Sequence, residues 1–165
     1  MVVNAIAAVV RVLALIPPIG RRMQASASYK LGGLFRLQER GEHALATRAA
    51  IAEMLTLLDR IPSIDGTLLG SYWWMYAKVA AESAEVAGDP ALRHLVVQTV
   101  TRGPMPLEGY HVAFSYLSAS RWMLASAPED ARRLAGLAVR ADPTWPEARI
   151  WFQELGELDG SPSAD

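Results

Sequence analysis

Residue types that commonly carry chemistry are sparse in this chain, and their spacing builds no site. The three histidines, His43, His94 and His111, lie far apart, and none has a second histidine or a carboxylate at the spacing of a metal-binding face. Metal ions require ligands that converge on one point. The stretch around Gly32-Gly33 lacks the lysine that phosphate-binding loops use. We therefore expect no metal and no cofactor.

Nucleophilic catalysis is equally unsupported by the sequence. Ser115, Ser118 and Ser120 are close together, but no nucleophile-elbow motif surrounds them. The chain has no cysteine, which excludes a thiol nucleophile, a cysteine zinc site and an iron–sulfur cluster. The sequence therefore predicts a protein that is not an enzyme.

Length and composition limit the class of protein further. The 165 residues suit one domain, and a hydrophobic content of 52% with 20% charged residues excludes disorder over most of the chain. The formal net charge is −1, so bulk electrostatics give no reason to expect a nucleic-acid partner. The absence of cysteine favours a reducing compartment, and we expect a cytoplasmic protein.

Any candidate site must be held by helices, because apolar residues recur at intervals of three and four and no run alternates over a strand length. The sequence predicts an all-α fold of about eight antiparallel helices joined by short connections. The first seven begin at or near residues 1, 24, 43, 67, 91, 108 and 128, and the eighth follows Pro146 and ends at about Leu158.

Several helix ends are marked by residues with special backbone preferences. Gly41 stops the second helix, and Gly88 can adopt the left-handed conformation at the end of the fourth. Asp89 can cap the fifth helix, with Pro90 in its first turn. Two further stretches have the spacing of a capping box and predict the starts of the last two helices: Ser126–Glu129 and Thr144–Glu147.

The amino-terminal stretch is almost wholly apolar. Arg11 interrupts it, Pro17-Pro18 ends it early, and Arg21-Arg22 follow it, whereas a signal peptide carries its positive charge in front. We expect a helix packed on the rest of the chain. The open alternatives are a helix bound to a partner or a membrane surface, and an anchor or targeting segment. The predicted divisions are an apolar helix (1–20), a helical-repeat domain (21–158) and a disordered tail (159–165).

One part of the chain has a recognisable repeat pattern. The stretch from Val112 to Trp145 covers two predicted helices. The later of the two carries small residues followed by a proline, at Ala131, Ala135, Ala138 and Pro143. The earlier helix of this stretch has Ala119 and Trp122 at the matching small and aromatic positions, whereas Ser115 and Ser118 depart from the pattern. This stretch resembles a tetratricopeptide repeat, and partial copies occur earlier at irregular intervals. The resemblance implies a short right-handed solenoid of stacked helical hairpins; an irregular helical bundle is the alternative.

The resemblance also implies a binding groove, because the first helix of each pair lines the concave surface of such proteins. That register places Tyr29, Trp74 and Tyr116 on the inner face, with Arg36 nearby. Three aromatic side chains in a row would suit a peptide or a partner helix, although aromatic stripes also serve as core packing.

The sequence therefore predicts a non-catalytic scaffold or adaptor of bacterial type that binds a segment of a partner protein. A structural subunit of a larger assembly is the alternative. It would dock through the apolar amino-terminal helix and could lie peripherally on the inner membrane. Arg132, Arg133 and Arg140, with Glu129 and Asp130 at the start of the same helix, are interpreted as a solvated face whose charges suit the helix dipole.

Overall fold

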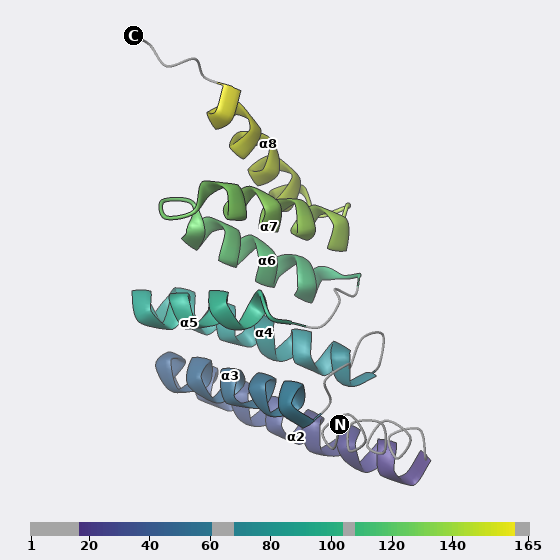
Figure 1. Ribbon diagram of the computed structural model, residues 1–165. Helices are drawn as coiled ribbons and strands as arrows, with labels where there is room; N and C mark the ends of the chain where they lie inside the picture. The colour runs from purple at the N-terminus through teal and green to yellow at the C-terminus, as the bar shows by residue number, and fades with distance from the viewer. Residues whose placement is uncertain (1–16, 61–67, 104–107, 161–165) are drawn as a thin grey trace, which may run out of the picture. The chain divides into compact units, whose positions relative to one another are not determined.

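In the computed structural model, the described residues are 17–60, 68–103 and 108–160, and they form seven helices and no strand. This confirms the all-α class for this part of the chain (Figure 1). The helices are α2 (Pro17–Glu39), α3 (His43–Arg60), α4 (Leu68–Ala87), α5 (Pro90–Val100), α6 (Tyr110–Met123), α7 (Pro128–Ala141) and α8 (Pro146–Gly160). The predicted first helix lies almost entirely outside these residues, as do its proposed membrane or partner contacts.

The helix bounds follow the sequence prediction closely except at α2. This helix already includes residues 17–23, whereas the sequence analysis assigned 17–20 to the apolar amino-terminal helix and began the next helix near residue 24. Proline is tolerated in the first turn of a helix, where its missing N–H would have no partner. Pro17-Pro18 therefore belongs to α2. At the other end of the chain, α8 continues two residues into the predicted tail, to Gly160.

The turns and the helix cap between the middle helices are as predicted. Gly41 and Gly88 have positive φ angles of 75° and 66°, the left-handed conformation that glycine adopts without steric penalty. The carboxylate of Asp89 accepts a hydrogen bond of 2.9 Å from the backbone N–H of Ala91. Pro90 occupies the first turn of α5.

Both predicted capping boxes are wrong. The residue that caps α7 is Ala127, and it has no side-chain capping bond. The Ser126 hydroxyl instead donates to the carbonyl of Met123 at 3.3 Å. Before α8, the hydroxyl of Thr144 donates to the carboxylate of Asp142 at 2.7 Å. In both cases the helix begins at a proline one residue later than the box requires, so the hydroxyl lies one residue before the cap position.

The chain divides into two compact units, residues 1–107 and 108–165, and each is described by itself. In the first unit α3 and α4 make the most extensive contact, and both also pack against α2 and α5. The largest buried side chains include Trp73, Trp74 and Tyr76 of α4. Gly103 has no room for a side chain, because a Cβ there would overlap the ring of Trp73.

Polar atoms of the buried aromatic residues tie α4 to its neighbours. The indole N–H of Trp73 donates to the carbonyl of Met54 in α3 at 3.1 Å. The hydroxyl of Tyr76 donates to the carbonyl of Ala27 in α2 at 2.9 Å. Such bonds satisfy buried donors that would otherwise be costly to remove from water.

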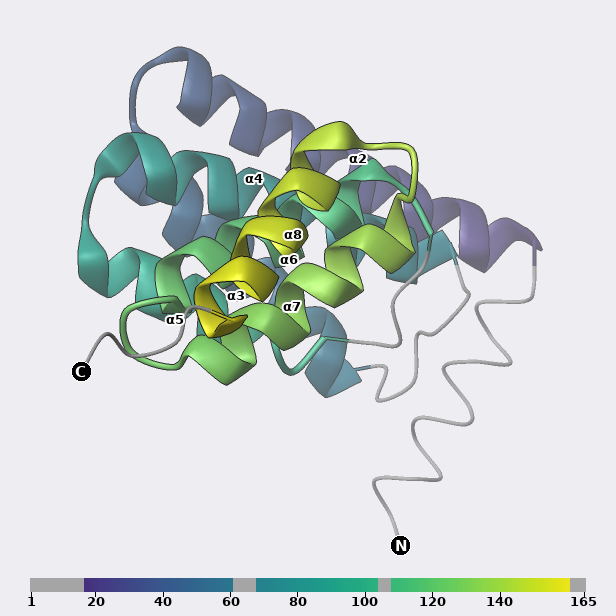
Figure 2. The ribbon, with the colours of Figure 1, turned by 90° about the horizontal axis from the view of Figure 1, so that it is seen from above.

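The second unit consists of α6, α7 and α8, and Figures 1 and 2 both show α6 and α7 side by side. Four alanines of the repeat pattern are completely buried: Ala119, Ala131, Ala135 and Ala138. The hydroxyl of Ser120 donates to the carbonyl of Ala131 at 2.6 Å and accepts from the indole N–H of Trp151 at 2.9 Å. One buried serine therefore connects all three helices of this unit.

None of the helices in the described ranges has the length and apolar character needed to cross a bilayer.

The buried hydroxyl of Tyr76 makes the first unit sensitive to alkaline pH. Burial raises the pKa of Tyr76 to about 12 from the ordinary 10.0, with a smaller contribution from the charge of Glu53. Between these values the folded chain holds a proton that the unfolded chain has lost, so stability falls as the pH rises. We expect a loss of roughly 2–3 kcal/mol over this interval, measured by denaturant unfolding.

The control is Tyr76→Phe, which cannot ionise and should show a smaller loss over the same pH interval. At neutral pH this variant should be less stable by about 1 kcal/mol, because its bond to Ala27 is gone. If the stability of the two proteins depended equally on pH, the loss could not be assigned to the ionisation of Tyr76.

Candidate functional site

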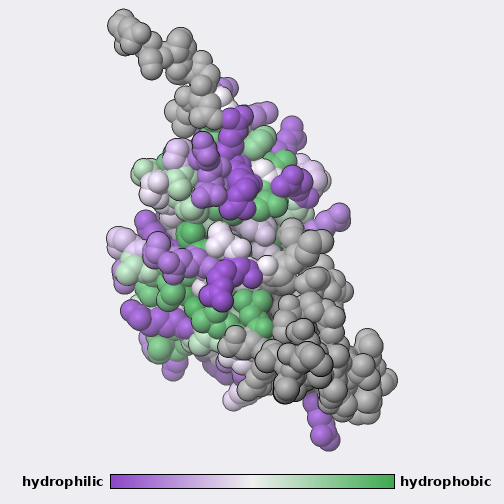
Figure 3. Space-filling view, viewed as in Figure 1, coloured by the Kyte–Doolittle hydropathy of each residue, from purple (hydrophilic) through white to green (hydrophobic). Residues whose placement is uncertain are grey.

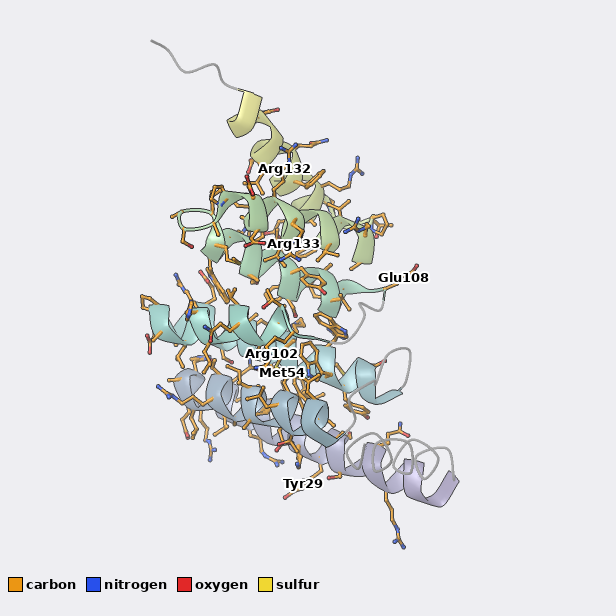
Figure 4. The ribbon with its side chains drawn as sticks, viewed as in Figure 1. Tyr29, Met54, Arg102, Glu108, Arg132 and Arg133 are labelled. Carbon is orange, nitrogen blue, oxygen red and sulfur yellow. The ribbon has the colours of Figure 1, made fainter. Side chains whose placement is uncertain are left out.

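The predicted groove residues of the first unit have different environments. Tyr29 and Arg36 are exposed on α2, with 76% of Tyr29 accessible (Figure 4 labels Tyr29). Trp74 is only 1% accessible and lies edge-on against Trp73, with ring centroids 4.7 Å apart. The prediction that Trp74 lines a groove is therefore corrected: three helices pack around α4, so aromatic residues on several of its faces are buried.

Tyr116 also lies in the interior, in the second unit. Its side chain is 6% accessible, and burial raises the pKa of its hydroxyl, while the positive charges of Arg133 and Arg140 oppose the rise. Tyr116 thus packs beneath the helix that carries these arginines and does not line a groove. The expected row of three aromatic residues is not present within either unit.

The second unit has an open cleft of about 730 Å³ beside α7 and α8. We call it the arginine cleft. Figure 3 shows hydrophilic side chains gathered over these two helices. The lining residues are Pro128, Glu129, Arg132, Arg133, Gly136, Arg140 and Phe152.

The sequence of α7 explains why these side chains share one face. Residues three, four, seven and eleven positions apart lie on the same side of a helix, which groups Glu129, Arg132, Arg133, Gly136 and Arg140. The opposite side carries the buried alanines and Leu134. Packing of the alanine side against α6 therefore turns the charged side outward.

The three arginines differ in their surroundings. Arg133 forms an ion pair with Asp130 at 3.1 Å. Arg132 leans toward α8, since its Nη2 atom is 3.8 Å from the Cβ position at Gly156; Figure 4 labels it on the α8 side of α7, with Arg133 on the α6 side. Arg140 is exposed and forms no ion pair with any carboxylate in the described residues. Of the three, Arg140 therefore adds a positive charge to the cleft that no carboxylate in the described part of the chain pairs with.

The middle of the cleft is apolar. The ring of Phe152, on α8, lies 3.4 Å from the Cβ position at Gly136, and the side chain is 37% accessible. A glycine at this place lets the ring approach the backbone of α7. The cleft thus has an apolar centre, with Arg140 toward one end and Glu129, Arg132 and Arg133 toward the other.

Sequence reasoning identified the three arginines but interpreted them as a solvated face. The missing signal was Phe152, which lies on another helix, together with Gly136 at the centre of the arginine spacing. The described residues contain no group of three histidine or acidic side chains that could hold a metal ion. Guanidinium groups stay protonated at any ordinary pH and cannot act as general acids or bases.

Comparison with known proteins gives no further assignment: no family model, no curated protein and no solved structure matches this chain.

Replacing Trp74 tests its placement in the core. The Trp74→Ala change should lower the free energy of unfolding by about 3–5 kcal/mol, because it leaves a large cavity. The matched control is Tyr29→Ala on the exposed face of α2, which should change it by less than about 0.5 kcal/mol. Both are measured by chemical denaturation of the full chain. A Trp74→Ala protein as stable as wild type would place the indole at the surface.

Proposed function

We propose that this protein is a non-catalytic interaction module that binds a segment of a partner protein in the arginine cleft. The observation that carries the proposal is the cleft itself, which is lined by three arginines, one glutamate and the exposed ring of Phe152. Arginine and aromatic residues are enriched at the positions that dominate protein–protein binding. An open cleft of this kind suits a chain segment better than an enclosed small molecule.

The helical-repeat resemblance is part of the same proposal. In both units each helix packs on its neighbour in sequence, and several also pack on the next but one, as α2 does on α4 and α6 on α8. Stacked hairpins of a tetratricopeptide-like, right-handed solenoid have this pattern. The buried alanines at the spacing of that motif support it. The role is that of an adaptor, and a cytoplasmic location is consistent with a chain that has no cysteine.

The proposed surface differs from the one that the resemblance implied. The arginines lie on α7, the second helix of its hairpin, whereas repeat proteins of this type use the first helix. Tyr29 and Arg36 remain exposed on α2, in the other unit from the arginine cleft. Binding through the cleft is therefore the version of the adaptor hypothesis that the geometry favours.

The test is affinity capture from a lysate of the source organism with the immobilised full chain. Two variants change the cleft: Arg140→Gln removes a charge, and Gly136→Leu fills the floor with a good helix former. The matched control is Arg149→Gln, which removes an exposed arginine of α8 outside the cleft. A partner should bind wild type and Arg149→Gln and be lost from both cleft variants, and its direct binding is then measured by calorimetry with purified proteins.

Two results would contradict the proposal. One is a set of bound proteins that is the same for all four baits. The other is the absence of any protein bound by wild type above an empty resin. Circular dichroism of each bait confirms that the variants are folded before the comparison is made.

A further inference from the structure

We infer that the outward face of α2 binds the surface of an anionic membrane. This face is a row of residues at intervals of three and four, none of them buried, which we call the α2 stripe: Arg22, Ala25, Tyr29, Gly32 and Arg36. The stripe belongs to the first unit, whereas the arginine cleft belongs to the second. The inference therefore stands apart from the proposed function.

The rest of the first unit packs on the opposite side of α2 and leaves the stripe open. The buried residues of this helix, among those described, are Ala27, Leu31 and Leu34. Tyr29 is 76% accessible, and Figure 4 shows its side chain pointing outward from α2. A Cβ atom at Gly32 would meet no atom of another helix within 4 Å. The described part of the chain thus leaves the stripe accessible to a partner.

Both ends of the stripe are cationic. Arg22 and Arg36 are exposed and form no ion pair with a carboxylate in the described ranges. Another basic side chain of α2, Lys30, lies off the stripe and pairs with Glu53 of α3 at 2.6 Å. The fourteen residues between the two arginines separate their Cα atoms by about 21 Å along the helix axis. A stripe of this length suits a partner that presents anionic groups over an extended area.

The sequence around the stripe has the same sign of charge over a longer range. Residues 1–38 contain five basic residues and no acidic residue, whereas residues 39–165 contain 11 basic and 17 acidic residues. The whole chain has a formal charge of only −1, so its positive charge is concentrated in the part that carries the stripe. Such a concentration of charge attracts an anionic surface, although the net charge of the protein does not.

The residues that precede α2 favour a lipid over another polyanion. All of residues 1–16 except Asn4 and Arg11 are apolar, and their placement lies outside the described ranges. A nucleic acid or an acidic protein offers charge to the arginines, whereas a bilayer offers anionic headgroups directly beside an apolar phase. Stable attachment to a membrane surface commonly combines an apolar element with a basic patch. This stretch and the α2 stripe supply the two.

The centre of the stripe also fits the headgroup layer of a membrane. Tyrosine is enriched there, because its ring can lie against lipid while its hydroxyl stays in water. Ala25 and Gly32, on either side of Tyr29, are small and allow the backbone of α2 to approach the lipid. The guanidinium groups of Arg22 and Arg36 would then form charge-assisted hydrogen bonds with lipid phosphates.

Vesicle sedimentation with the full chain tests the surface directly. Vesicles of phosphatidylcholine alone are compared with vesicles in which about one-third of the lipid is phosphatidylglycerol, at equal total lipid. The protein should bind the anionic vesicles at least about tenfold more tightly, and added sodium chloride should weaken this binding. Equal binding to both kinds of vesicle, or binding to neither, would overturn the inference.

Charge variants then locate the lipid on the protein. Arg22→Gln and Arg36→Gln should each weaken binding to the anionic vesicles about fivefold, and the double variant about 25-fold, since the two sites are far apart. The matched control, Arg149→Gln, removes an exposed arginine of α8 and should leave binding unchanged. Circular dichroism confirms that each variant is folded. A folded double variant that binds as tightly as wild type shows that the stripe is not the lipid-binding surface.

A fluorescent label reports whether Tyr29 itself meets the lipid. Because the chain has no cysteine, Tyr29→Cys provides a single attachment point for an environment-sensitive fluorophore. Its emission should shift to the blue when anionic vesicles are added. The control label, at Gln153→Cys on the exposed side of α8, should show no shift. A shift at Gln153 as large as that at Tyr29 would contradict docking through α2.

An oligonucleotide separates a lipid partner from a nucleic acid. A labelled single-stranded oligonucleotide, at the same phosphate concentration as the anionic vesicles, should bind at least about tenfold more weakly, because it offers no apolar phase. If the oligonucleotide binds as tightly as the vesicles, and the double arginine variant loses both, the stripe is a nucleic-acid site and the membrane inference is wrong.

Discussion

The close packing of α7 on α6 through alanine is the constraint on which the second unit depends. Ala119, Ala131, Ala135 and Ala138 have no accessible surface, and a larger side chain at any of them would push the helices apart. Because these positions are fixed inward, the residues between them are fixed outward. The alignment of three arginines along the cleft is therefore a consequence of core packing, and no separate interaction is needed to orient α7.

A second constraint operates in the first unit, where α4 is covered by α2, α3 and α5. A helix enclosed on several sides can bury consecutive aromatic residues, and Trp73 and Trp74 do so in edge-to-face contact. The bonds of Trp73 and Tyr76 to backbone carbonyls of α3 and α2 then fix how these helices meet. The aromatic cluster that suggested a groove thus holds the unit together.

Local signals in the sequence predicted the helices well, because glycine and proline act through their own backbone geometry. The left-handed turns at Gly41 and Gly88 are examples. The two capping boxes failed because α7 and α8 begin at Pro128 and Pro146, one residue later than the boxes require, which leaves the serine and threonine outside the cap position. The alanine spacing correctly predicted which face of α7 is buried, since helical periodicity fixes the direction of each side chain.

The candidate site was harder to predict because it depends on how many neighbours each helix has. A register derived from a repeat assigns one inner face to each hairpin, and this placed Trp74 and Tyr116 in a groove. The sequence could not reveal that α4 is covered on three sides, nor that Phe152 of α8 lies over Gly136 of α7. These are contacts between elements, and a single helical pattern carries no information about them.

The location of the cleft has a consequence for how binding relates to stability. Every lining residue belongs to the second unit, so the surface does not depend on how the two units are placed. Within α7 the core residues and the lining residues alternate along one helix but point in opposite directions. Substitutions at Arg140 therefore change charge at the surface without touching the alanine contacts. Gly136 is different, because its missing side chain serves both the floor of the cleft and the seat of Phe152. A Cβ there would lie 3.4 Å from the ring, which is ordinary contact, so alanine fits and only a longer side chain meets both the cleft and the contact between α7 and α8.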